Sequence, residues 1–142
     1  MKKVILIVIS IVIILGGLYV LMRIDGKNND KESKTYVDKI VPLIMSNFDF
    51  LEMAKNASPE MKETLNTKTG SEAMKMFQKK YGKFIKYEGS AGESVQYFTL
   101  KGIIMTAEYK CKITYENGSI QITINLIKHS SVWQILNFNL NL

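Results

Sequence analysis

Residues 103–116 alternate between apolar and polar side chains, and this alternation constrains the fold more than any other feature of the chain. Every second side chain belongs to one apolar set, Ile103, Met105, Ala107, Tyr109, Cys111, Ile113 and Tyr115. The side chains between them are mostly polar, namely Ile104, Thr106, Glu108, Lys110, Lys112, Thr114 and Glu116. A period of two residues predicts a β-strand that buries one face and exposes the other.

Asn117-Gly118 directly follows this strand and predicts a β-hairpin, because a type I′ turn needs positive φ at both central positions. Closing the hairpin there pairs Tyr115 with Ile120, Ile113 with Ile122, Cys111 with Ile124, and Tyr109 with Leu126. All these side chains are apolar and share one face. A slip of one residue would break the match, so we expect a well-specified register.

Further strands are predicted on both sides of this hairpin. Residues 84–88 and 95–100 form two strands separated by the turn-like GSAGES, and VWQILNFNLNL returns after a turn at Ser130-Ser131. A three-residue loop would place Leu136 beside Ile124 and Phe138 beside Ile122, with Trp133 and Ile135 on the opposite face. The opposite parity of this last strand stays open.

Helices are predicted before the strands. Residues 37–48 carry apolar side chains at helical spacing, namely Val37, Ile40, Val41, Ile44, Met45 and Phe48. Pro42 predicts a kink in this helix or a start near it. Ser58-Pro59-Glu60 begins a short helix that runs to about Leu65. Ser71-Glu72 begins another, with Met74, Phe77 and Tyr81 on one side and Gly82 after its end.

Residues 4–22 contain no charged side chain, and as a helix they span roughly 28 Å at ~1.5 Å per residue, close to the thickness of a bilayer core. The run ends in bulky residues, which favours an uncleaved anchor over a cleaved secretion leader, although the leader remains an alternative. Lys2 and Lys3 favour an amino terminus inside the cytoplasm. We therefore expect a transmembrane signal anchor over residues 1–23, a polar linker over residues 24–34, and an extracytoplasmic α+β domain over residues 35–142.

Charge and cysteine content exclude some functions. The chain has 19 basic and 13 acidic residues, a net charge of +6, and removing Lys2, Lys3 and Arg23 leaves +3 for residues 24–142. This balance is ordinary for a protein surface and predicts no nucleic-acid partner. Cys111 is the only cysteine, so no intramolecular disulfide forms, and its place on a strand predicts a small buried side chain.

Helices followed by an antiparallel sheet form an α+β plan, and here the chain resembles the nuclear transport factor 2-like superfamily, with its cystatin-like α+β cone. The resemblance is closest to small bacterial membrane-anchored domains of unassigned function. It rests on YVDKIVPLIMSNFDF with ASPEM, on the Gly82 break before KFIKYEG, on AEYKCKITYENGSIQITINLIK, and on VWQILNFNLN. It implies helices packed on a curved antiparallel sheet over residues 35–142.

Enzymes of this superfamily that are similar to steroid isomerases place an acid or a histidine inside the cone. The predicted inner face of this sheet has neither, so we expect no catalytic residue, and Asp38, Asp49 and Glu52 are interpreted as solvated helix residues. His129 beside the Ser130-Ser131 turn has no partner at ligand spacing, which predicts no metal and no cofactor. An isomerase- or dehydratase-like enzyme of the same superfamily remains the alternative.

Two groups of residues are candidates for binding. An apolar cleft in the cone is predicted to be lined by Tyr36, Met105, Tyr109, Tyr115 and Trp133. A basic run has two interpretations, a patch that faces anionic lipid or a solvated helix end, and it consists of Lys75, Lys79, Lys80, Lys83 and Lys86.

These expectations combine into a non-enzymatic binding or assembly module in the bacterial cytoplasmic membrane. Residues 4–22 are expected to hold the protein in the membrane. The cone and the sheet are expected to bind a protein partner or a small apolar ligand. An anchor raises the effective concentration of a weak binding module at the membrane.

Overall fold

The computed structural model describes the backbone of residues 2–141 and the side chains of residues 9–18 and 26–140. The chain is an α+β protein in which four helices precede a four-stranded antiparallel sheet. The helices are α1 (Lys2–Asn47), α2 (Phe50–Lys55), α3 (Pro59–Thr64) and α4 (Thr67–Tyr81). The strands are β1 (Phe84–Thr99), β2 (Gly102–Tyr115), β3 (Gly118–His129) and β4 (Val132–Asn141).

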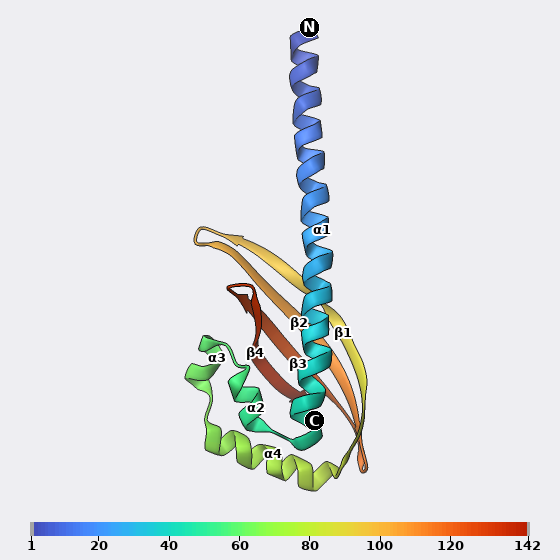
Figure 1. Cartoon of the computed structure of the whole chain (residues 1–142), viewed down its shortest axis with the longest axis vertical. Helices are drawn as coiled ribbons and strands as arrows, with labels where there is room; N and C mark the ends of the chain where they lie inside the picture. The colour runs from blue at the N-terminus through green and yellow to red at the C-terminus, as the bar shows by residue number, and fades with distance from the viewer. Residues whose placement is uncertain (1, 142) are drawn as a thin grey trace.

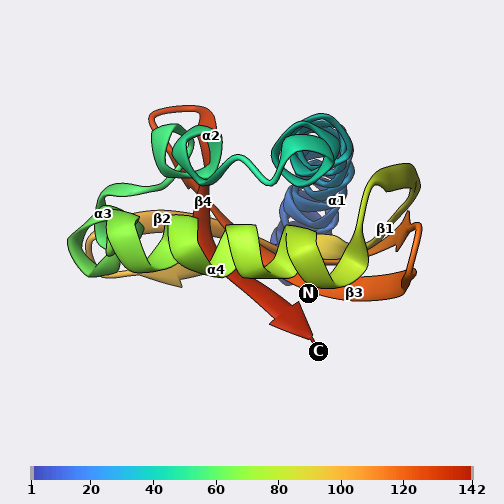
Figure 2. The same cartoon turned by 90° about the horizontal axis from the view of Figure 1, so that it is seen from below.

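The sheet is a meander with the strand order β1-β2-β3-β4. Figure 1 shows α1 running along the sheet and continuing far beyond it at its N-terminal end, while α4 crosses the opposite end of the domain. Figure 2 shows α1 and α2 on the same side of the strands. The other face of the sheet, which carries Glu108, Lys110 and Lys112, is exposed. We call the helix-bearing face the inner face and the exposed face the outer face.

α1 is longer than the sequence pattern predicted. All six apolar residues expected on its buried face are buried, as predicted, but the helix neither starts at Pro42 nor ends before it. A proline inside a helix costs ~3 kcal/mol or more. Val41, Ile44 and Met45 are fully buried around it, and burying each such side chain contributes roughly 1.5–3 kcal/mol, which offsets that cost.

Residues 24–34, which the sequence predicted to be a polar linker, are helical and belong to α1. Asn29 and Ser33 are buried against the sheet, about two turns and one turn before Val37, respectively. The packed face of the helix therefore continues through small polar side chains that a search for apolar spacing does not detect.

Within the described residues, we find no helix whose length and hydropathy would let it cross a membrane. The expected anchor at residues 4–22 falls partly outside the described side chains, which leave out residues 2–8 and 19–25 of α1. Among those described, Val12, Ile13 and Ile14 are exposed.

The short helices are delimited by side-chain caps. Ser58 Oγ accepts from Met61 N–H at 3.2 Å and caps α3, with Pro59 in its first turn, as predicted. α4 begins at Thr67, four residues before the predicted start, because Asn66 Oδ1 caps it by accepting from Thr69 N–H. α2 was not predicted, and its cap is Asp49, which accepts from Glu52 N–H at 2.9 Å.

β1 is one strand, so the turn predicted at GSAGES was wrong. Gly89 has a φ of 114° and lies at a register shift in the β1–β2 pairing, where a bulge keeps the strand continuous. Gly92 faces Tyr109 across the ladder, and a Cβ there would clash with the Glu108 carbonyl oxygen. The glycines thus serve a bulge and a close backbone approach within a strand.

The β2–β3 hairpin has the predicted strands and faces, but its register is displaced by two residues. Tyr115 pairs with Gly118 and Ile113 with Ile120, so the loop residues are Glu116 and Asn117. Only Gly118 of this turn has a positive φ, at 142°, so the type I′ turn was wrong. A shift of two residues keeps every side chain on its predicted face, since the period is two.

The sequence left two parities open for the last strand, and the residues before and after Leu136 each follow a different one. Ile124 pairs with Phe138, whereas Leu126 pairs with Ile135, because Leu136 is the extra residue of a bulge. Trp133 and Ile135 are consequently buried, and Phe138 and Leu140 pack against the same core.

An aromatic cluster fills the core where α1, α4 and β2 meet. Tyr115 lies at its centre with 2% exposure, and its hydroxyl donates to the Met45 carbonyl at 3.1 Å. The rings within 5.2–6.3 Å of Tyr115 are Phe48, Phe77, Tyr81 and Phe84. This cluster closes the domain at the end remote from the N-terminus.

Candidate functional site

A groove of about 660 Å³ lies between the middle of α1 and the β3–β4 turn. Its wall on α1 includes Tyr36, and its wall on the turn is formed by Val132 and Trp133. The remaining residues that line it are Asn28, Lys31, Glu32, Thr35, Lys39 and Ser131. We call this feature the α1–turn groove.

Trp133 lines this groove with its ring, while its indole N–H is buried. Its side chain is 5% exposed, and its Nε1–H has no acceptor at hydrogen-bond geometry among the described residues. Glu32 lies close enough for the indole N–H to contribute to lowering the pKa of its carboxyl group, although Trp133 is the smallest contributor. A buried N–H without an acceptor is unfavourable by about 1–3 kcal/mol, and this atom is closed off from the groove by the side chains around it.

Charges surround the apolar walls of the groove. Lys128 Nζ donates to Glu32 Oε2 at 2.6 Å and lies 5.4 Å from the Trp133 ring centroid. The hydrogen bond from Lys128 is the largest cause of the lowered pKa of Glu32. Lys31 and Lys39 line the same groove. The groove therefore combines an apolar wall with exposed cations.

Tyr36 is held at the groove by packing more than by hydrogen bonding. Its hydroxyl lies 3.4 Å from Asn56 Oδ1, a long contact. Burial, followed by the negative charge of Glu52, raises the pKa of Tyr36 to about 12. The phenol is neutral at physiological pH and supplies apolar surface with one hydroxyl.

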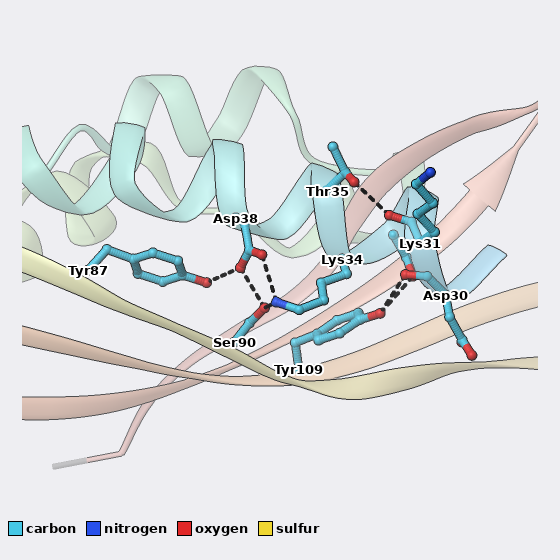
Figure 3. A network of polar contacts seen from close by, with 9 residues as sticks. Asp30, Lys31, Lys34, Thr35, Asp38, Tyr87, Ser90 and Tyr109 are labelled. Atoms are coloured by element: carbon cyan, nitrogen blue, oxygen red, sulfur yellow. Dashed lines mark hydrogen bonds and ion pairs between the residues drawn. The ribbon is translucent and has the colours of Figure 1, made fainter. Parts of the chain in front are cut away.

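A second polar feature connects α1 to β1 and is drawn in Figure 3. Asp38 accepts from Tyr87 OH at 2.7 Å, from Ser90 Oγ at 2.6 Å and from Lys34 Nζ at 2.7 Å. Burial raises the pKa of Asp38, but these hydrogen bonds and the charge of Lys34 outweigh it, so the pKa is lowered overall. This carboxyl group is an ionised acceptor, and we call the set the Asp38 clamp.

Asp30 forms a parallel clamp closer to the N-terminus. Its Oδ1 accepts from both the backbone N–H and the Oγ of Ser94, at 2.7 and 2.6 Å. Tyr109 OH donates to the Asp30 carbonyl at 3.1 Å and lies 2.9 Å from Ser33 Oγ. Together the two clamps fix α1 to the middle of β1.

Cys111 and Tyr87, which lie in the sheet beneath the clamps, are poorly reactive. Burial raises the pKa of the Cys111 thiol to about 11, partly offset by a hydrogen bond from Tyr87. Burial also raises the pKa of Tyr87 itself. Both groups are protonated at neutral pH, so Cys111 is a poor nucleophile.

The structure separates the five residues predicted to line one cleft. Tyr36 and Trp133 meet at the α1–turn groove. Tyr109 and Tyr115 are core residues with their hydroxyls bonded to α1, and Met105 is partly buried against the core. Two of the five residues therefore contribute to an accessible hollow.

The predicted basic run lies on α4 and at the start of β1, where all five lysines are exposed. Figure 1 shows this part of the chain at the end of the domain opposite to the N-terminus. Electrostatic attraction falls off within a Debye length of about 8 Å at physiological ionic strength. The geometry therefore favours a solvated helix end for these lysines over a membrane contact next to an anchor.

His129 lies at the end of β3, where its Nε2 is 3.1 Å from Glu60 Oε1 on α3. It thus has one carboxylate neighbour rather than full exposure. Among the described side chains, no group of three or more histidine, cysteine, aspartate or glutamate residues is arranged to hold a metal ion.

Sequence reasoning missed the clamps and half of the groove. Asp30, Lys34 and Asp38 recur every four residues, the spacing of one helix face. This spacing was the available signal, but residues 24–34 were interpreted as a spacer. No signal pointed to Val132, since its role depends on a turn that returns to α1.

Comparisons with models of known protein families, with characterised proteins and with solved structures found no match for this chain.

Proposed function

We propose that this protein is a non-enzymatic, membrane-anchored binding module that takes an apolar group into the α1–turn groove. The group belongs to a protein partner or to a small apolar ligand. The observation that carries the proposal is the groove between Tyr36, Val132 and Trp133, whose apolar walls are bordered by charged side chains.

The shape of the groove supports binding. Val132 is 58% exposed at its edge, next to the buried Trp133 ring, so an apolar group finds contact area there without rearrangement of the core. Aromatic side chains that present an apolar body and a polar tip are typical of binding interfaces. Lys31 and Lys39 would favour a partner with acidic residues beside its apolar group.

The Asp38 clamp supports a binding role over the alternative of an isomerase- or dehydratase-like enzyme. A general base works best with a pKa near the working pH, whereas the hydrogen bonds to Asp38 lower its pKa. Asp38 is thus better suited to holding α1 in place than to removing a proton from a substrate.

The membrane anchor and the location belong to the same proposal. The charge-free residues 4–22 support a signal anchor in the bacterial cytoplasmic membrane, with the sheet domain outside the cytoplasm. The helices packed on an antiparallel sheet support a nuclear transport factor 2-like domain. A secreted form without its leader is the alternative, and the mass of the mature amino terminus decides between the two.

The groove is tested by photo-crosslinking of the full chain in its native membrane. A benzophenone amino acid replaces Val132, and the same replacement at Lys112, which is exposed on the outer face, is the matched control. We expect a light-dependent adduct from position 132 and none from position 112. A second arm titrates oleate into detergent-solubilised protein and follows the fluorescence of Trp133, the only tryptophan.

The outcomes separate the two kinds of bound group. A protein adduct at position 132 that is lost in the Tyr36→Ala variant supports a protein partner. Saturable quenching of Trp133 by oleate, weakened by the same variant, supports a small apolar ligand. Equal adducts at both positions together with no quenching would overturn the groove as a binding site.

A further inference from the structure

The tip of the β1–β2 hairpin is apolar on both faces, unlike the rest of the sheet. The paired residues Phe98 and Ile103 lie on the inner face, and Tyr97 and Ile104 lie on the outer face. All four are exposed, with Phe98 at 64%, and Leu100 in the turn is fully exposed. Scattered exposed apolar residues are ordinary, but a contiguous cluster marks an interaction surface.

Hydrogen bonds within the turn fix its conformation. Thr99 Oγ1 donates to the Gly102 carbonyl at 2.7 Å and accepts from Lys101 N–H at 3.2 Å. Gly102 has a φ of 122°, which only glycine adopts readily. We call residues 95–104 the hairpin tip.

The hairpin tip points toward the end of the molecule from which α1 emerges (Figure 1). The last clamp between α1 and β1 joins Asp30 to Ser94. From Ser94 to Leu100 the strand extends roughly 20 Å at ~3.3 Å per residue, and from Asp30 back to residue 22 the helix extends roughly 12 Å at ~1.5 Å per residue. The strand is inclined to the helix, and in Figure 1 the β1–β2 turn is the part of the sheet that lies furthest toward the N-terminal end of α1.

The charge pattern of the tip fits an anionic lipid surface. Lys101 is the only charged residue between Glu93 and Glu108. Tyrosine is enriched at the membrane interface, and a lysine near the surface of an anionic membrane contributes about 1 kcal/mol to binding. The acidic residues of the sheet begin only below the tip.

We propose that the hairpin tip inserts into the interface of the same bilayer that holds residues 4–22, and thereby gives the domain two points of attachment. This inference rests on the proposed anchor. One helix alone leaves the domain free to rotate and tilt, whereas a helix and an inserted hairpin fix one orientation. The α1–turn groove then faces a constant direction relative to the membrane.

Two other occupants of the tip are a second copy of this chain and a folded partner. Both would need a surface shaped to cover apolar side chains on two opposite faces of a narrow hairpin. A fluid bilayer surrounds both faces without such shape complementarity. The geometry therefore favours lipid.

The test uses spin labels on the full chain in vesicles of phosphatidylethanolamine and phosphatidylglycerol. In a Cys111→Ala background, single labels are placed with Leu100→Cys at the tip, Ile14→Cys in the apolar helix, and Lys112→Cys on the same strand β2 as the control. Accessibility to oxygen and to an aqueous nickel chelate reports immersion. We expect the label at position 100 to be severalfold less accessible to the chelate than the label at position 112, and less immersed in vesicles of phosphatidylcholine alone.

Each outcome bears on one proposal. Immersion of the label at position 14 with a chelate-accessible label at position 100 overturns the inserted tip and leaves the anchor supported. A chelate-accessible label at position 14 overturns the anchor, and position 100 then still reports independently on the tip. Spin–spin broadening at position 100, with shielding from both oxygen and chelate, overturns lipid as the occupant in favour of a second copy.

Discussion

The two ends of strand β2 differ in what their side chains contact. At the Tyr115 end, the adjoining turn is bonded back to the domain, since Glu116 N–H donates to the Lys83 carbonyl and Asn117 N–H to the Tyr81 carbonyl. At the Gly102 end, the side-chain hydrogen bonds described for the adjoining turn all join residues of the turn itself. One end of the strand stabilises the fold, and the other presents apolar surface outward.

One regular strand therefore has two roles, since one end stabilises the fold and the other presents apolar surface. Between the two ends, the clamps at Asp38 and Asp30 hold α1 on β1. Beyond Ser94 no such clamp holds the hairpin among the described side chains. Substitutions at the Tyr115 end should therefore reduce folding stability, whereas substitutions at the tip should change interactions with other molecules.

The largest effect is expected from Tyr115→Leu. It removes a ring from the aromatic cluster and a hydroxyl bonded to the Met45 carbonyl, and we expect the free energy of unfolding to fall by about 3 kcal/mol. Urea unfolding of the full chain in nonionic detergent, followed by circular dichroism, measures it. The matched substitution Phe98→Leu at the tip should change this free energy by less than about 0.5 kcal/mol. Similar losses in the two variants would contradict the comparison.

The next effect is expected from Asp38→Asn, which weakens the clamp between α1 and β1. We expect a loss of about 1–2 kcal/mol at pH 7, at the low end for a charged acceptor because the carboxylate is more than a third exposed. The control is Glu108→Gln, which changes an exposed carboxylate on the outer face and should have a smaller effect.

The clamp also predicts a pH dependence. The pKa of Asp38 is lowered in the folded protein, so its contribution is present above the unfolded value of 3.8 and is lost as the pH falls through the folded value. Unfolding midpoints measured between pH 7 and pH 3 should therefore converge for the native chain and Asp38→Asn. A constant difference at all pH values would show that Asp38 acts through packing alone.

A smaller effect is expected from Glu116→Gln at the polar turn. Glu116 Oε2 accepts from Lys83 N–H at 2.9 Å, and loss of its charge should destabilise the domain by about 0.5–1 kcal/mol. Lys101→Gln in the opposite turn should leave the unfolding midpoint unchanged while reducing binding to vesicles that contain phosphatidylglycerol. If Lys101→Gln proved the more destabilising, the assignment of the two turns would be reversed.

The smallest effect, and a stabilising one, is expected from Ser131→Gly in the β3–β4 turn. Ser130 and Ser131 have φ values of 47° and 68°, a region that favours glycine. We expect a gain of about 0.5 kcal/mol in the free energy of unfolding, from the midpoint of urea unfolding. The control is Ser119→Gly, where the serine has no such positive φ and the same change should not stabilise.

Local periodicity was enough to predict much of the fold. The alternation from Ala107 to Tyr115 and the helical spacing from Val37 to Phe48 both match the buried faces of the structure. The cap at Ser58 and the end of α4 at Gly82 were also predicted. These features depend on near neighbours in the sequence, which is why a pattern of residue types indicates them.

Turns and registers were less predictable. The β2–β3 pairing is displaced by two residues from the predicted register, and in the observed turn Glu116 bonds to Lys83, which is remote in sequence. Leu136 forms a bulge that lets Trp133 and Phe138 share one core. In the groove, Tyr36 and Val132 are almost a hundred residues apart, and only the packing of α1 on the sheet brings them together.

The sequence by itself determined which faces of the strands and helices are apolar, because side-chain periodicity follows directly from backbone geometry. It also contains the charge-free residues 4–22 on which the proposed anchor depends. Only the tertiary structure decided where α1 meets the sheet, which polar residues clamp it there, and which apolar residues remain exposed at the hairpin tip. The reason is that burial is a property of contacts between distant segments, and one residue type is buried in Ile113 and exposed in Ile103 on the same face of the same strand.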